Sequence, residues 1–226
     1  MARILFVTGT DTGVGKTLVA ASLLFHLRRQ GISALAMKPF CSGSRADVQL
    51  LQSIQRGAIA DQEANPFYFR EPLAPSIAAR KAGKEITLRD TLDRIRSIAS
   101  RCERLIVEGA GGLFAPLGAG FNAADLIAAL ECDVCVVAAN KLGTINHTLL
   151  TVRALPSNDS LPVKVLLTQA KRRPDPSTRT NAAMISELLG EIPVVSLPYL
   201  GPRAATIPSI RRNQLKTEAV WEAIQA

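Results

Sequence analysis

The chain has 226 residues, a formal net charge of +8 and an aromatic content of 4%. This length suits one large domain, and because no shift in composition marks a boundary, residues 1–226 are predicted to form a single domain. Few aromatic side chains and scattered basic residues argue against nucleic-acid binding. The sequence has no signal-peptide pattern and no apolar run of about 18 residues, so we expect a cytoplasmic protein without membrane contact.

Apolar runs alternate with helical patterns along the whole chain. Runs that are apolar throughout are typical of strands buried on both faces of a parallel sheet. The alternation therefore predicts an α/β fold of the P-loop NTPase type, a doubly wound and mostly parallel sheet with helices on both faces. The predicted strands are 4–7, 34–37, 105–107, 134–139, 163–167 and 194–197. The predicted helices are 16–30, 47–55, 75–82, 87–100, 123–129, 145–155, 178–189 and 214–226.

A glycine-rich loop, GTDTGVGKT over 9–17, follows the first predicted strand. It misses the pattern G-x-x-x-x-G-K-[ST] by one place, because Thr10 stands where the pattern has glycine. A buried strand before the loop and a helix after it nevertheless favour phosphate binding, since backbone N–H groups converge on one point there. Lys16 would reach the β- and γ-phosphates, and the Thr17 hydroxyl would bind Mg²⁺.

Two carboxylates and a second lysine stand at predicted strand ends or in short loops. Asp47 follows the segment KPFCSGS (38–44), and Glu108 ends a predicted strand before a glycine-rich turn. Carboxylates hold Mg²⁺ against phosphate oxygens, although an ordinary place in a first helical turn is an equal alternative for Asp47. Lys38 ends the second predicted strand, where it would either neutralise charge on a transferring phosphoryl group or extend its ammonium group from the sheet edge into solvent.

Cys132 and Cys135 have the spacing of a redox pair. Cys135, however, lies inside an apolar run, where a small thiol packs well. We therefore interpret both cysteines as packing residues, and with two histidines in the chain we do not expect a zinc site.

Several segments together resemble the dethiobiotin synthetase family. They are GTDTGVGKT (9–17), KPFCSGS (38–44), NPFYFREPLAPSIAA (65–79), VEGAGGLFAPL (107–117) and KLGTINHTLLT (141–151), in that order. The resemblance implies a ligase of biotin biosynthesis that converts 7,8-diaminononanoate, CO₂ and ATP to dethiobiotin, ADP and phosphate with Mg²⁺ as cofactor. One amine would capture CO₂ as a carbamate, the γ-phosphate would be transferred to it, and the second amine would close the ring by attacking the carbamic-phosphoric anhydride. Such chemistry requires mainly positioning and charge stabilisation from the protein.

The resemblance also implies roles for particular residues. Lys38, Lys16 and Thr12 would be catalytic, and the Mg²⁺ ligands would be Thr17, Asp47 and Glu108. The ATP site would consist of Gly13, Val14, Gly15, Lys16, Thr17, Leu18, Asp47, Glu108, Gly109, Ala110, Gly111, Thr168 and Gln169. The substrate site would consist of Thr12, Ser42, Gly143, Thr144, Ile145 and Asn146. The family works as a homodimer in which the substrate carboxylate lies against the partner's helix start, here residues 143–146.

Two departures from the family pattern and one alternative accompany this interpretation. Residues 74–76 read Ala-Pro-Ser where the family has Ser-Pro-His, and Thr168 stands where an asparagine would contact the adenine. A partition-type P-loop switch ATPase that binds DNA or membrane is the alternative. Such ATPases carry a lysine five residues before the loop lysine, where this chain has Asp11.

Overall fold

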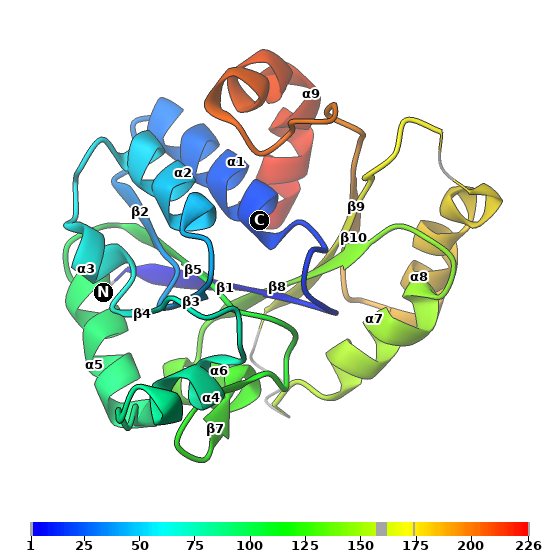
Figure 1. The fold of residues 1–226 in the computed structure, drawn as a ribbon. Helices are drawn as coiled ribbons and strands as arrows, with labels where there is room; N and C mark the ends of the chain where they lie inside the picture. The colour runs from blue at the N-terminus through cyan, green and yellow to red at the C-terminus, as the bar shows by residue number, and fades with distance from the viewer. Residues whose placement is uncertain (1, 157–161, 174, 226) are drawn as a thin grey trace.

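A computed structural model describes residues 2–156, 162–173 and 175–225 (Figure 1). Its centre is a parallel sheet of six strands in the order β10-β9-β8-β1-β5-β2. Every predicted strand is present, which confirms the doubly wound α/β prediction. The bounds are β1 Arg3–Gly9, β2 Ala34–Met37, β5 Arg104–Glu108, β8 Asp133–Ala139, β9 Val163–Thr168 and β10 Val194–Leu197.

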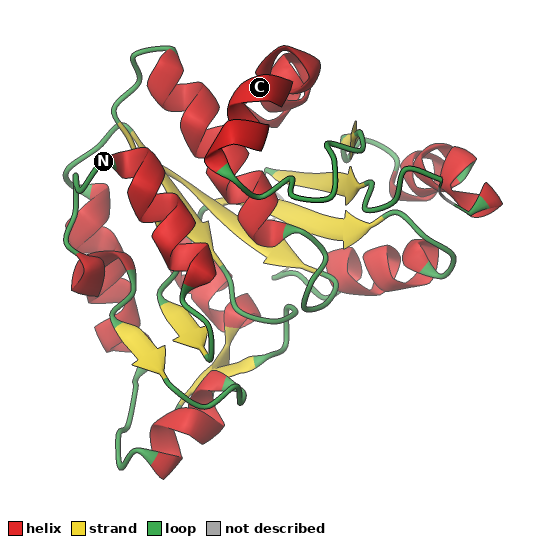
Figure 2. Cartoon of the chain, turned by 45° about the horizontal axis from the view of Figure 1, so that its top comes forward, coloured by secondary structure: helices red, strands yellow, loops and turns green. Residues whose placement is uncertain are grey.

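Helices cover both faces of this twisted sheet (Figures 1 and 2). Alternate strand residues point to opposite faces, so Phe6 and Val136 belong to one hydrophobic cluster while Val7 and Val137 belong to the other. On one face lie α1 Lys16–Arg29, α2 Ala46–Gln55 and α9 Ile207–Gln225. On the other lie α4 Pro75–Lys81, α5 Leu88–Ala99, α6 Ala123–Leu130, α7 Thr144–Arg153 and α8 Asn181–Leu189.

Helix boundaries differ from the prediction mainly at α9. It begins at Ile207 rather than at 214. Pro208 makes the preceding segment resemble a loop, but a proline is tolerated in the first helical turn because the N–H it lacks has no partner there. The predicted last residue, Ala226, lies outside the described residues.

Short elements that the sequence pattern did not predict sit beside the carboxyl edge of the sheet. They lack periodicity because each spans only one turn or a few residues. They are β3 Phe40–Ser42, β4 Phe67–Phe69, β6 Pro116–Gly118, β7 Phe121–Asn122, α3 Asp61–Ala64 and the 3₁₀ turn η1 Pro176–Arg179.

The two spaced cysteines lie on opposite faces of the sheet. Cys132 packs in one hydrophobic cluster and Cys135 in the other, and both are free thiols. Burial raises the pKa of each thiol to about 12. The interpretation of these residues as packing groups is therefore confirmed. Among the described helices, none combines the length and apolar character needed to cross a membrane.

Candidate active site

The loop between β1 and α1 has the backbone of a phosphate cradle. Gly13 and Gly15 have φ values of 76° and 103°, a region that favours glycine. A side chain at Gly9 would place its Cβ 2.8 Å from Val14 Cγ2. Gly9, which stands one place earlier than the sequence pattern requires, therefore allows the Val14 side chain to pack directly against the start of the loop.

Lys16 is the first residue of α1, directly after this loop. Its Nζ donates to the carbonyl oxygens of Asp11, at 2.8 Å, and Gly111, at 2.6 Å. Lys16 therefore joins the loop to the glycine-rich turn after β5. Burial, assisted by the nearby Lys38 cation, lowers the pKa of Lys16 to about 8, and the attraction of Glu108 offsets only part of that effect.

Glu108, the last residue of β5, is hydrogen-bonded to other predicted site residues. Its side chain has 0% exposure, and its Oε1 accepts hydrogen bonds from Thr17 Oγ1 and Lys38 Nζ, both at 2.7 Å. Lys38 also forms an ion pair with Asp47. Burial acts to lower the pKa of Lys38, but Glu108 and Asp47 outweigh it and raise the pKa above its ordinary value, so Lys38 stays a cation at neutral pH.

The donors around Glu108 fit Mg²⁺. Its second oxygen, Oε2, is buried without a hydrogen-bond partner, and the Thr17 hydroxyl and the Asp47 carboxylate lie on the same side-chain network. In residues 2–156, 162–173 and 175–225, no group of three or more His, Cys, Asp or Glu side chains could hold a metal. A hydroxyl with carboxylates nevertheless suits Mg²⁺, which commonly takes its remaining ligands from phosphates and water.

Asn65 holds the backbone that carries Lys38. Its Nδ2 donates to the carbonyl oxygens of Lys38, at 2.9 Å, and Pro39, at 3.3 Å, while the Lys38 N–H donates to the carbonyl of Ala64. Asn65 begins the segment 65–79 that resembles the family, but no role was predicted for it. An amide immediately before a proline was the available signal, because such a residue is held in an extended or turn conformation.

The predicted substrate residues come from three places. Thr12 is exposed in the phosphate loop, and Ser42 is half-buried at the end of β3. Gly143, with φ 88°, precedes the first residue of α7, and no side chain caps this helix. The Thr144 N–H donates to the Lys141 carbonyl at 3.1 Å. The N–H groups of Ile145 and Asn146 have no intrahelical partner, as a carboxylate site requires. The remaining members of this start are Thr144, which is buried, Ile145, which is half-buried, and Asn146, which is exposed.

Thr168 and Gln169 lie where β9 ends. The Thr168 hydroxyl is buried and has two carbonyl acceptors, Val14 at 2.7 Å and Ala138 at 3.4 Å. The shorter bond, to Val14, is the one that joins it to the phosphate loop. Gln169 donates from its side-chain amide to the Lys171 carbonyl at 2.8 Å. A contact between Gln169 and a nucleobase stays a prediction.

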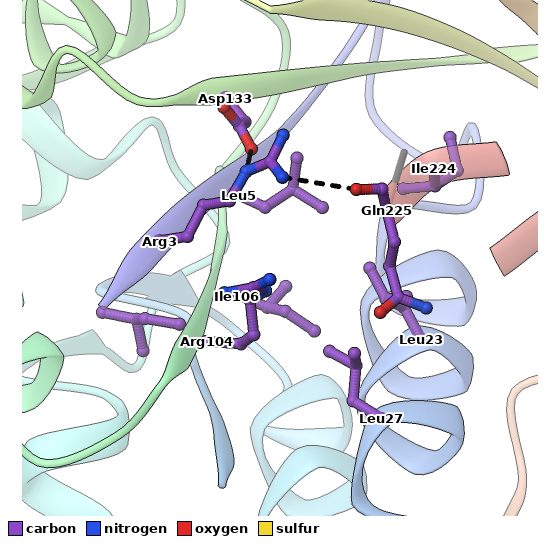
Figure 3. A pocket seen from close by; sticks show the side chains of 10 residues that line it. Arg3, Leu5, Leu23, Leu27, Arg104, Ile106, Asp133, Ile224 and Gln225 are labelled. Atoms are coloured by element: carbon purple, nitrogen blue, oxygen red, sulfur yellow. Dashed lines mark hydrogen bonds and ion pairs between the residues drawn. The ribbon is translucent and has the colours of Figure 1, made fainter. Parts of the chain in front are cut away.

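A small pocket at the opposite, amino edge of the sheet is unsuited to a nucleotide. It encloses about 30 Å³. Arg3 forms an ion pair there with Asp133 and donates to the Gln225 carbonyl at 3.3 Å (Figure 3). These contacts place a cation at the carboxyl end of α9, where the helix dipole favours it, and so the pocket is structural.

A parallel sheet whose first strand leads through a glycine loop into a helix, with a lysine and a hydroxyl at the loop's end, defines a P-loop nucleotide-binding protein. A family model described as an AAA domain matches residues 3–203. The chain is 43% identical over 216 residues to the ATP-dependent dethiobiotin synthetase BioD of Anaeromyxobacter dehalogenans (strain 2CP-C), covering 92% of this chain and 96% of that one. It is 37% identical over 213 residues to the enzyme of that name from Bacillus subtilis (strain 168), covering 91% and 89%. The chain belongs to the ATP-dependent dethiobiotin synthetase family.

Solved structures of other P-loop proteins are similar in fold. A ParA family ATPase from Chlorobium tepidum TLS matches with a TM-score of 0.58 at 15% identity, covering 99% of this chain and 93% of that one. The signal recognition particle receptor FtsY from Elizabethkingia anophelis matches with a TM-score of 0.53 at 14% identity, covering 95% and 65%. At these identities the likeness concerns the fold alone.

Proposed function

We propose that the protein is a ligase that uses ATP and CO₂ to close the ureido ring of dethiobiotin on 7,8-diaminononanoate, with Mg²⁺ as cofactor. The observation that carries this proposal is a buried carboxylate, Glu108, that bonds both the lysine after β2 and the hydroxyl next to the phosphate-loop lysine. Lys38 is bonded to Glu108 directly, and Lys16 immediately precedes Thr17, whose hydroxyl bonds the same oxygen. Family membership supplies the substrates, and this cluster supplies the charge that phosphoryl transfer needs.

The positions of the two lysines indicate different roles, because Lys38 is bonded to the buried carboxylate and Lys16 lies at the end of the phosphate loop. Lys38, whose pKa is raised, is a permanent cation at neutral pH and stabilises the carbamate oxygens and the phosphoryl group that moves to them. Lys16 binds the β- and γ-phosphates. Bound Mg²⁺ would neutralise phosphate charge and would be held by Thr17, Asp47 and Glu108. Thr12 and Ser42 are proposed to position the carbamate and the diamine.

The diamine carboxylate is proposed to bind at the start of α7 in a partner subunit of a homodimer. No side chain caps this helix, and the N–H groups of Ile145 and Asn146 in its first turn suit a carboxylate. Leu142, in the turn before the helix, is 80% exposed, and Leu150, on the helix, is 60% exposed, so a partner subunit could bury both. The enzyme is proposed to act in the cytoplasm, without nucleic acid or membrane.

A switch ATPase is not favoured. The ParA family structure resembles this chain in fold only, and Asp11 occupies the place of the lysine that partition-type loops carry.

A coupled assay of ADP release, with and without 7,8-diaminononanoate, tests the reaction. We expect turnover that requires the diamine and bicarbonate, and we expect Lys16→Ala and Lys38→Ala each to abolish it. Lys84→Ala, which removes an exposed lysine away from the cluster, is the matched control. Full activity in either active-site variant, or turnover stimulated by DNA or lipid instead of the diamine, would refute the proposal.

The shared substrate site is tested at Asn146. Asn146→Pro removes one N–H of the first turn of α7, a position where proline leaves the helix intact. We expect the KM for the diamine to rise with little change in the KM for ATP. Equal effects on both constants would argue against a carboxylate site at this helix.

A further inference from the structure

Thr168 joins the phosphate loop to a strand that does not carry the loop. It is the last residue of β9, which is separated from β1 by β8 in the sheet. Its hydroxyl donates to the Val14 carbonyl at 2.7 Å across a sequence separation of 154 residues, and the residue is 5% exposed. This buried hydrogen bond holds the Val14–Gly15 peptide of the loop against the end of β9.

That bond sets the direction of the next N–H group. The described residues contain no cis peptide bond, and in a trans peptide the carbonyl and the N–H point to opposite sides. With the Val14 carbonyl turned towards β9, the N–H of Gly15 is turned away from β9. The Thr168 methyl group also packs closely on Gly15, because a Cβ built on Gly15 would lie 3.0 Å from it.

We propose that Thr168 is a positioning residue of the phosphate loop, whose hydroxyl fixes the Val14–Gly15 peptide so that the Gly15 N–H faces the polyphosphate of the bound nucleotide. The inference rests on the ATP-binding part of the proposed function. It assigns Thr168 to the phosphate end of the nucleotide, whereas the family resemblance placed this position at the adenine. A preset N–H of this kind raises affinity because binding no longer has to order it.

Calorimetric titration with two probes separates the two assignments. Mg²⁺-ATP reports on the whole nucleotide, and inorganic tripolyphosphate with Mg²⁺ reports on the phosphates alone. Thr168→Val keeps the shape of the side chain but removes the hydroxyl. We expect it to lower the affinity for both ligands by about tenfold, which is the effect of losing one buried hydrogen bond. Thr168→Ser restores the hydroxyl and should stay within about twofold of the unaltered protein for both ligands.

The outcomes are separable. Weaker ATP binding with unchanged tripolyphosphate binding would place Thr168 at the base and overturn the proposal, as would unchanged binding of both ligands to Thr168→Val. Thr168→Ala repeats the comparison if the valine variant does not fold, and thermal unfolding without ligand identifies that case. Because neither titration contains the diamine, an absence of synthetase activity would refute the proposed reaction without touching this result.

Discussion

The lowered pKa of Lys16 makes ATP binding sensitive to pH above neutrality. The ammonium group is buried among the carbonyls of Asp11 and Gly111, and its pKa is about 8. Only the protonated form attracts phosphate, and bound phosphate stabilises that form. Affinity for Mg²⁺-ATP is therefore greatest below pH 8 and falls as the pH rises through that value.

The size of the effect follows from the pKa. With a pKa of about 8, about 91% of Lys16 is protonated at pH 7 and about 9% at pH 9. The dissociation constant for Mg²⁺-ATP should therefore rise by about tenfold over this interval, and binding at pH 8 should take up about half a proton. Calorimetry in buffers of different ionisation enthalpy measures both quantities.

Lys16→Arg is the matched control, because a guanidinium stays charged across this range. Whatever affinity that variant retains should be the same at pH 7 and pH 9, with no proton uptake. An affinity of the unaltered protein that is constant from pH 7 to pH 9, without proton uptake, would refute the reasoning.

Further predictions concern the residues around this site and the buried thiols. Glu108→Gln leaves buried Lys38 with a single carboxylate partner, so the free energy of unfolding in urea should fall by about 3 kcal/mol, and a fall below about 1 kcal/mol would contradict the ion-pair argument. Asn65→Ala should lower kcat while leaving the affinity for Mg²⁺-ATP unchanged in calorimetry, because it frees the backbone of Lys38 and not the phosphate loop; an equal loss of ATP affinity would be inconsistent. Cys132 and Cys135 should react with a thiol reagent only in denaturant. Rapid labelling of the native protein would show that the two hydrophobic clusters do not shield these thiols from solvent.

The central sheet could be predicted because its strands are buried on both faces and so consist of uninterrupted apolar residues. The start of α9 could not, because Pro208 is compatible with both a loop and a first helical turn, and packing against α1 decides between them. The small sheets formed by β3 with β4 and by β6 with β7 have two or three residues per strand. Segments this short carry no period, and the pairing of β3 with β4 also joins residues more than 20 positions apart in sequence.

The side chains with charge at the site were predictable, whereas those that hold its backbone were not. Lys38 and Glu108 stand out in sequence because a charged group at the end of an apolar strand requires a reason, and Lys16 stands out because it ends a glycine-rich loop. Asn65 and Thr168 give no such signal, since an amide or a hydroxyl is acceptable in many surroundings and its meaning depends on which carbonyl it meets.

Asn65 donates to the carbonyl of Lys38, and Thr168 donates to the carbonyl of Val14, which lies two residues before Lys16. Each lysine-bearing segment is therefore held by a neutral donor from a different part of the chain, so that neither lysine depends on the other to keep its backbone in place. Removing one donor should accordingly disturb one lysine alone: Asn65 variants should act on turnover and Thr168 variants on phosphate binding. If the double variant Asn65→Ala with Thr168→Val showed effects on ATP affinity far beyond those of Thr168→Val alone, the two supports would be coupled and this separation would be wrong.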